Sequence, residues 1–411
     1  GNYARWAGQA YRISEGRGTI VHSPPTFDLT VTSLLAPLLV GQAVHLVPVS
    51  DGIESVVRAV GDVEDVTLLK LTPSHLRLLR GMLGTGSAAR IRTLVVGGET
   101  LPGDEVAAWR ALSPGVRIVN EYGPTETVVG CAWWESRPSD DAAAPIPIGF
   151  PIDNTMLWVL DDEFGPVPAG CAGELFVGGR GVARGYLGDP RLTAERFLPD
   201  PHAETAGARL YRTGDRAWHA GGSGLRFAGR TDRQVKVRGH RVELDEVEIT
   251  LAGHPAIATA AVQLHVDSHG GARLVAYVVP RHGETLDLER VREHLRDRLP
   301  AYMLPAGLVT LSCLPVTANG KLDRSALPPP EFDRSGSSVP FARPTNEQER
   351  LVAAVWAEVL GLPEVGALDN FFEIGGDSFS IVKVAARLEE LTGTAVPVAR
   401  AFESPTVRSL A

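Results

Sequence analysis

Cysteine is scarce in this sequence. Its 411 residues include three cysteines, Cys131, Cys171 and Cys313, which lie far apart. They do not form the CxxC or Cys/His spacing of a zinc site, and an odd, scattered set is typical of reduced thiols in the cytoplasm. Basic residues are also outnumbered, because 40 Lys and Arg stand against 49 Asp and Glu, a net charge of −9. This balance disfavours a nucleic-acid-binding protein, which usually carries a basic surface.

An uninterrupted membrane span is missing as well. Residues 31–49 are largely apolar, but Pro37, Gly41 and Pro48 interrupt them. This pattern predicts a buried helix, a turn at Gly41 and a buried strand. The first ten residues also lack the shape of a signal peptide. We therefore expect a cytoplasmic protein with no membrane partner.

Strand-like and helix-like runs alternate from residue 15 to about residue 230. The predicted strands cover residues 67–71, 91–99 and 117–123, and the predicted helices between them cover residues 73–83 and 103–112. Such alternation predicts a parallel sheet covered by helices, so the fold class is α/β. Residues 150–230 are richer in glycine and turns and are expected to form shorter β elements.

The remainder of the chain predicts further domains. Two strand-like runs and an amphipathic helix (286–299) form a smaller α+β unit, a Pro- and Ser-rich linker follows, and the last stretch has helical patterns. We expect a large α/β core, a small mobile subdomain, a linker and a four-helix-bundle domain, with these boundaries: 1–231, 232–328, 329–344 and 345–411.

The sequence "FFEIGGDSFS" sets Ser378 at the start of a helical pattern, directly after two glycines and an aspartate. A serine at this place usually caps a helix. With no histidine close by to act as a base, it is not expected to be a self-activated nucleophile. Such a hydroxyl suits modification by another enzyme, and a phosphodiester there would lie favourably at a helix N-terminus. The stretch "DNFFEIGGDSFS" resembles the carrier-protein signature whose serine receives 4'-phosphopantetheine.

The rest of the chain resembles the adenylation domains of nonribosomal peptide synthetases. The resemblance covers nearly the whole chain and lies in ordered motifs: "FDLT", "NEYGPTE", "GELFVGGRGVARGYL", "YRTGD", "GRTDRQVKVRGHRVELDEVE", "LPAYMLP" and "NGKLDR". It implies a two-step reaction. An amino acid and Mg·ATP give aminoacyl-AMP and pyrophosphate, and the pantetheine thiol on Ser378 then takes the aminoacyl group as a thioester.

One family feature has no counterpart in this sequence, namely the Gly/Ser/Thr-rich loop ending in Pro-Lys-Gly that surrounds the β- and γ-phosphates. Residues 221–229 are glycine-rich but lack the lysine. We therefore expect a truncated large domain that turns over ATP poorly when it is alone. A remnant in which only the carrier unit functions is one alternative.

The resemblance also implies a nucleotide site. Tyr122 would offer a flat face to adenine, Thr125 would bond phosphate, and Glu126 would suit Mg²⁺. Asp215 would bind the ribose hydroxyls with Arg230 nearby. The remaining residues of the implied ATP site are Gly97, Gly98, Glu99, Asn120 and Gly123. Polar turns are the plain alternative for the motifs that contain Tyr122 and Asp215.

Three residues carry the implied domain movement and its chemistry. Asp232 matches the hinge between the large and small domains. Lys236 matches a lysine used in the thioester-forming state. Lys321 matches the lysine that stabilises negative charge in the adenylation step. A solvated loop aspartate and surface lysines are the alternatives.

The resemblance places the substrate pocket at nine positions, with Lys321 closing the site: Asp28, Leu29, Thr32, Lys70, Val95, Gly97, Glu121, Val129 and Gly130. Asp28 would hold the α-ammonium group. The substrate's side chain would meet Lys70 as donor and Glu121 as acceptor, which suits the primary amide of asparagine. Aspartate, glutamine or another acyl substrate remain alternatives, as does a direct pairing of Lys70 with Glu121 or a register error at Lys70.

The partners implied are the amino acid, a phosphopantetheinyl transferase and neighbouring synthetase domains such as a condensation domain. The need for an MbtH-like helper protein stays open. An acyl- or aryl-acid ligase is the nearest rival enzyme, and Asp28 argues against it because an α-amino group requires an anion.

Overall fold

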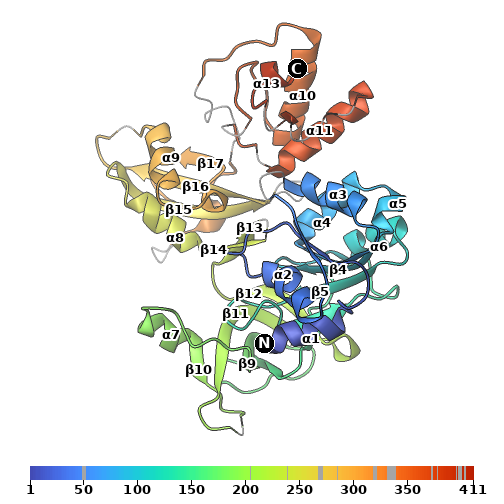
Figure 1. The fold of residues 1–411 in the computed structure, drawn as a ribbon. Coiled ribbons are helices and arrows are strands. Elements are labelled where there is room, and N and C mark those ends of the chain that lie inside the picture. The colour runs from blue at the N-terminus through green and yellow to red at the C-terminus, as the bar shows by residue number, and fades with distance from the viewer. Residues whose placement is uncertain are drawn as a thin grey trace. The chain divides into compact units, whose positions relative to one another are not determined.

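The computed structural model describes the chain except for a set of short segments: residues 49–51, 204, 238, 267–271, 285, 318–321, 331–338, 372–373, 377, 395, 397–399 and 402–403. The chain divides into two compact units, Gly1–Asp232 and Arg233–Ala411. Figure 1 shows the first unit in blue to yellow-green and the second in yellow to red.

The first unit begins with alternating helices and strands. Its helices are α1 (Asn2–Ala10), α2 (Thr30–Leu39), α3 (Gly52–Asp62), α4 (Pro73–Met82), α5 (Thr85–Ala88), α6 (Gly103–Leu112) and α7 (Pro190–Arg196). Its strands up to residue 151 are β1 (Thr19–Val21), β2 (Val44–Leu46), β3 (Val66–Leu71), β4 (Ile91–Gly97), β5 (Arg117–Tyr122), β6 (Ala132–Glu135) and β7 (Phe150–Pro151). The predicted strands 67–71, 91–99 and 117–123 are thus confirmed.

These strands form a seven-stranded sheet in the order β2-β1-β3-β4-β5-β6-β7. The first five strands are parallel, and β6 and β7 continue the sheet antiparallel. A parallel sheet needs cover on its faces. Helix α1 and Ala36 of α2 pack on one face against Leu68, Val95 and Val119, while α4 contacts β3 and β4 and packs with α3 and α6.

A second sheet in this unit is antiparallel and lies where the sequence predicts short β elements, but β9 and β11 are longer than the strands of the first sheet. Its strands are β8 (Thr155–Leu160), β9 (Ala172–Gly179), β10 (Phe197–Pro199), β11 (Arg209–His219) and β12 (Leu225–Arg230). They follow the order β10-β11-β9-β8, with β12 paired to β11. Tyr122 and Ala132 from the first sheet pack into a cluster with side chains of the second, and this places the motif at the end of β5 beside β11.

The second unit starts with a hairpin of β13 (Val235–Val237) and β14 (His240–Val242), followed by α8 (Leu244–Ala252). A three-stranded sheet follows, formed by β15 (Ile257–Val266), β16 (Ala272–Pro280) and β17 (Gly307–Thr310), with helix α9 (Leu288–Arg296) packed into the same core. The Asp287 side chain caps α9 by accepting from the amide nitrogens of Glu289 and Arg290, so the predicted helix at 286–299 is shorter at both ends.

The last stretch is helical and contains α10 (Glu347–Leu360), α11 (Ser378–Thr392) and α13 (Val407–Leu410). The amide of Glu349 donates to the Asn346 side chain at 2.7 Å, so Asn346 is the N-cap of α10. Helix α11 begins at Ser378, as predicted, and ends at Thr392, before Gly393 with its positive φ. The residue before Ser378 lies outside the described part of the chain.

Residues 31–49 correspond to α2 and β2 as far as they are described, so the predicted helix–turn–strand order is confirmed to Pro48. The strand was predicted to be buried, and that was wrong. β2 lies at the edge of the sheet, and Leu46 on it is 71% exposed. Among the described residues, none of the helices has the length and apolar character needed to cross a bilayer.

Candidate functional site

Three neighbouring parallel strands carry four of the predicted pocket positions. The register places Lys70 of β3 beside Val95 of β4, and Gly97 of β4 beside Glu121 of β5. Paired residues on adjacent strands face the same way, and so do residues two apart on one strand. The four positions therefore share one face of the sheet. Helix α1 covers this face, because Val95 packs in one cluster with Tyr3, Trp6 and Tyr11.

Lys70 and Glu121 form an ion pair, and each side chain is only 1% exposed. Lys70 donates from Nζ to Oε2 of Glu121, while the hydroxyls of Tyr3 (2.7 Å) and Tyr11 donate to Oε1. The hydroxyls of Tyr3 and Thr32 lie 2.5 Å apart. The direct pairing that the sequence left as an alternative is therefore present. Both oxygens of a buried carboxylate have donors, which a buried charge requires.

Burial, followed by the charge of Glu121, raises the pKa of Tyr3 and Tyr11 well above the usual value for tyrosine. Both hydroxyls therefore keep their protons at neutral pH and act as donors to the carboxylate.

Two glycines make room for this carboxylate. A Cβ at Gly130 would lie 2.3 Å from Cδ of Glu121, and a Cβ at Gly97 would lie 2.7 Å from the backbone oxygen of Glu121. Contacts this short require other atoms to move. The absence of side chains at Gly97 and Gly130 is thus needed for the position of Glu121.

The other predicted pocket positions lie at the start of α2 and in the loop between β5 and β6. Leu29, Thr32 and Val95 are buried, and Val129 packs against the α1 cluster. Asp28, two residues before α2, accepts a hydrogen bond from the hydroxyl of Thr125. The predicted ammonium-binding carboxylate thus lies beside the predicted phosphate-binding hydroxyl, although 97 positions separate them in the sequence.

The implied nucleotide residues on β5 face the other side of the sheet. Asn120 and Tyr122 flank Glu121, so their side chains point away from the substrate positions. Nδ2 of Asn120 donates to the carbonyl oxygens of Ile146 (3.3 Å) and Pro147 (2.8 Å). The hydroxyl of Tyr122 donates to Asp215, and burial followed by that carboxylate raises the pKa of Tyr122.

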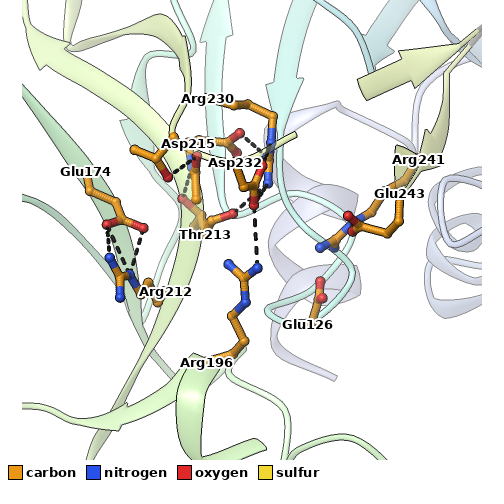
Figure 2. Close-up of polar contacts among 12 residues, drawn as sticks. Glu126, Glu174, Arg196, Arg212, Thr213, Asp215, Arg230, Asp232, Arg241 and Glu243 are labelled. Carbon is orange, nitrogen blue, oxygen red and sulfur yellow. Dashed lines mark hydrogen bonds and ion pairs between the residues drawn. The ribbon is translucent and has the colours of Figure 1, made fainter. Parts of the chain in front are cut away.

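Arg230 bridges the implied ribose residue and the implied hinge, as Figure 2 shows. It pairs with Asp215 through Nη1, and it donates to Asp232 through Nε (2.7 Å) and Nη2 (2.9 Å). Arg196, at the end of α7, reaches the same Asp232 at 3.5 Å. Gly214 is needed here because a Cβ on it would lie 2.5 Å from Oδ2 of Asp232. The strand register explains the first pair, since Asp215 and Arg230 lie opposite each other on β11 and β12.

Other residues of the implied ATP site lie in two loops. Glu99, two residues after β4, accepts hydrogen bonds from the hydroxyl (2.8 Å) and the amide (3.2 Å) of Ser74 in the first turn of α4. Gly98 before it has a φ of +90°, a left-handed conformation that glycine adopts without strain. Gly123 opens the loop after β5, and a Cβ on it would lie 2.7 Å from the carbonyl oxygens of Val128 and Val129.

Glu126, the implied Mg²⁺ ligand, lies in this loop and accepts a hydrogen bond from the hydroxyl of Tyr186 at 2.7 Å. A carboxylate is a ligand that Mg²⁺ uses together with phosphates and water, so the residue type fits the ion. Within the described residues, no group of three or more His, Cys, Asp or Glu side chains is placed to hold a metal by itself.

Three predicted residues belong to the second unit and are not placed against this site. Lys236 lies on the β13–β14 hairpin and is exposed. Lys321 lies outside the described residues. Ser378 begins α11.

Sequence reasoning missed Tyr3, Tyr11 and Tyr186. Tyr186 lies within a quoted motif, "GELFVGGRGVARGYL", and could have been singled out there. Tyr3 and Tyr11 lie in a segment without a recognised motif. Their only signal is the helical spacing of large aromatic side chains, which is more typical of a core.

Comparison with known families assigns these parts. The AMP-binding enzyme family matches residues 2–187, its C-terminal domain family matches residues 246–321, and the phosphopantetheine attachment site family matches residues 350–411.

Relatives of the whole chain are large synthetases. Tyrocidine synthase 3 of Brevibacillus parabrevis is 39% identical over 414 residues, and bacitracin synthase 3 of Bacillus licheniformis is 40% identical over 412 residues. Each match covers 100% of this chain but 6% of the relative's length.

Solved structures agree with this assignment. A holo nonribosomal peptide synthetase protein containing adenylation and PCP domains, bound to a vinylsulfonamide inhibitor, has a TM-score of 0.77 at 27% identity and covers 96% of this chain and 65% of that one. A holo four-domain nonribosomal peptide synthetase bound to AMP and glycine is 33% identical with a TM-score of 0.51, and the match covers 100% of this chain and 30% of that one.

The fold and the site define an α/β adenylation core with a C-terminal carrier domain. The chain belongs to the AMP-binding enzymes of the nonribosomal peptide synthetase type, joined to a phosphopantetheine attachment domain.

We predict that Lys70→Met lowers the free energy of unfolding by about 3–5 kcal/mol, because it leaves a buried carboxylate without its cation. Denaturant unfolding followed by tryptophan fluorescence would measure this loss. Arg92→Met is the matched control. It breaks the Arg92–Asp65 pair, whose side chains are 46% and 33% exposed, and we expect a loss of less than about 1 kcal/mol.

Adding Glu121→Gln to Lys70→Met should recover part of the stability, since the unpaired buried charge is then removed. Equal losses for Lys70→Met and Arg92→Met would contradict the stabilising role assigned to the buried pair.

Proposed function

We propose that this chain is the adenylation–carrier portion of a synthetase module, which activates an amino acid with ATP and loads it on a phosphopantetheine arm carried by Ser378. In the first step the carboxylate attacks the α-phosphate, which gives aminoacyl-AMP and releases pyrophosphate. In the second step the pantetheine thiol attacks the acyl carbon, AMP leaves, and a thioester forms. The observation that carries this proposal is the order of the family matches, with AMP-binding parts at 2–187 and 246–321 and a carrier at 350–411.

The first unit supports the nucleotide part of the proposal. Asp215 lies between Tyr122 and Arg230 and is 4% exposed, a position that suits a carboxylate exchanging a protein partner for ribose hydroxyls. Asp28 and Thr125 lie in hydrogen-bond contact, so an ammonium group on the first would bring the substrate's carboxyl end towards the loop of the second. Glu126 would hold Mg²⁺ beside the phosphates, and Lys321 would supply positive charge to the adenylation step.

The division of the chain supports a role for Asp232 as hinge. The boundary between the two compact units falls in the chain between Asp232 and Arg233. Lys236 would then belong to the mobile unit and serve thioester formation. The domain limits proposed from the sequence, 232–328 for the small subdomain and 345–411 for the carrier, lie within the second unit.

We further propose asparagine as the substrate. Lys70 and Glu121 together carry no net charge, so a neutral side chain leaves the buried pair balanced. A carboxylate side chain would add a negative charge beside Glu121 in a dry environment, which costs several kcal/mol. A primary amide matches the pair, because its oxygen accepts from Lys70 and its NH₂ donates to Glu121.

The remaining partners follow from these roles. A phosphopantetheinyl transferase would modify Ser378, and neighbouring synthetase domains such as a condensation domain would receive the acyl group. We leave an MbtH-like protein as a candidate helper.

The carrier role predicts that incubation with a phosphopantetheinyl transferase and coenzyme A adds the mass of one phosphopantetheine group to the chain. Ser378→Ala should abolish the gain, whereas Ser380→Ala, two residues along α11, should keep it. Intact-mass spectrometry measures both. A gain that persists in Ser378→Ala would refute the assignment.

The two lysines should separate the two half-reactions. Lys321→Ala should lower amino-acid-dependent pyrophosphate exchange about a hundredfold or more, because it removes charge from the transition state. Lys236→Ala should spare that exchange and slow thioester formation. Both are measured in the native polypeptide that carries this chain. The same defect in both assays for both variants would contradict the division of roles.

The substrate is tested with a panel of twenty amino acids in the adenylation assay. Asparagine should give the highest kcat/KM. Glu121→His should raise the use of aspartate relative to asparagine, because it removes the negative charge that opposes a carboxylate. A hydrophobic amino acid at the head of the parent's panel would overturn the asparagine proposal.

A further inference from the structure

Two tyrosines that belong to no recognised adenylation motif bind the carboxylate oxygen of Glu121 that Lys70 does not bind. The hydroxyls of Tyr3 and Tyr11 both donate to Oε1, while Lys70 occupies Oε2. We propose that Tyr3 and Tyr11 are specificity-determining positioning residues, which fix the orientation of Glu121 and so set the length of side chain that the pocket accepts. This inference rests on the proposed amino-acid-activating function.

The two tyrosines are themselves rigidly held. Tyr3 is 3% exposed and Tyr11 is fully buried. Trp6 packs between them, with ring centroids 6.1 Å from Tyr3 and 5.3 Å from Tyr11, and it contacts the ring of Trp133 edge-on at 5.6 Å. Interlocked aromatic rings of this kind leave little freedom to their hydroxyls. Tyr3 lies on α1 and Tyr11 is the residue that caps its C-terminus, so both donors are positioned by the same helix.

The number of donors decides what remains for a ligand. An ionised carboxylate has about four acceptor positions, and three donors already reach Glu121. About one acceptor position is left, in a fixed direction. Lys70 has three N–H donors, of which one goes to Glu121. The pair therefore offers one acceptor and spare donors at a fixed depth, which matches a single amide at one distance from the substrate's Cα.

This geometry separates two kinds of discrimination. Asparagine and glutamine have the same amide, and they differ only in the depth at which it lies. Asparagine and aspartate have the same length, and they differ in charge. Positioning of Glu121 by the tyrosines governs the first discrimination, while the charge of Glu121 governs the second. Removal of one tyrosine hydroxyl leaves the charge in place but allows Glu121 to turn about its side-chain bonds.

The test uses Tyr3→Phe, Tyr11→Phe and the double variant, assayed in the native polypeptide. We measure kcat/KM for asparagine, glutamine and aspartate by pyrophosphate exchange. A ratio between two substrates on one preparation is independent of how much of the protein is folded. We expect the asparagine-to-glutamine ratio to fall about tenfold, the size of one hydrogen bond to a charged group, while the asparagine-to-aspartate ratio changes less than twofold.

Tyr211→Phe is the matched control. Tyr211 is equally buried, it lies on β11 in the other sheet of the same unit, and its hydroxyl is 3.4 Å from that of Tyr186. Its loss should leave the asparagine-to-glutamine ratio within twofold. The asparagine-induced rise in melting temperature gives a second readout that needs no turnover, and it should shrink in the Tyr3 and Tyr11 variants.

The outcomes distinguish this inference from the function on which it rests. If the parent prefers asparagine but both tyrosine variants keep the parent's asparagine-to-glutamine ratio, the positioning role is overturned and the proposed function stands. The positioning role is overturned in the same way if Tyr211→Phe lowers the ratio as much. If a hydrophobic amino acid gives the highest kcat/KM with the parent protein, the asparagine proposal is wrong, and this inference is overturned together with it.

Discussion

The burial of one carboxylate, that of Glu121, constrains the surrounding structure. A charge taken out of water must be paired and hydrogen-bonded, or it destabilises the fold by several kcal/mol. Lys70 supplies the countercharge from β3, which is separated from β5 by one strand. Tyr3 and Tyr11 supply hydroxyl donors from the N-terminal segment. Gly130 must lack a side chain because the carboxylate occupies the place where its Cβ would lie. Segments far apart in the sequence thus depend on one buried ion pair.

Because β5 is pleated, its side chains contribute to two different proposed sites on the two faces of the sheet. Glu121 faces the proposed substrate positions, while Asn120 and Tyr122 face the proposed nucleotide site on the other side of β5. A strand can serve both sites because successive side chains point to opposite faces. The loop that follows joins them, since the hydroxyl of Thr125 contacts Asp28. A shift of one residue in β5 would therefore disrupt both sites at once.

A second charged group lies at the end of the first unit. Arg230 pairs with Asp215 and Asp232, so a ligand that draws Asp215 away would also change the surroundings of the proposed hinge. Arg196 offers Asp232 a second partner at 3.5 Å. This arrangement gives a physical route by which nucleotide binding in the proposed function could influence the hinge, through exchange of partners by a single guanidinium group.

The sequence by itself determined three strands of the parallel sheet (β3, β4 and β5), the helices α4 and α6 between them, the start of α11 at Ser378, and the family. Periodicity and ordered motifs are local, and a core strand or a phosphate-binding turn needs particular residues at short spacing. It could not determine the edge position of β2, which depends on sheet order, or the cap of α10. Only the tertiary structure showed that Lys70 and Glu121 form an ion pair and that Tyr3 and Tyr11 donate the remaining hydrogen bonds to Glu121. The reason is physical, because the donors of a buried charge are selected by distance in space, and residues 118 apart in the chain carry no shared local signal.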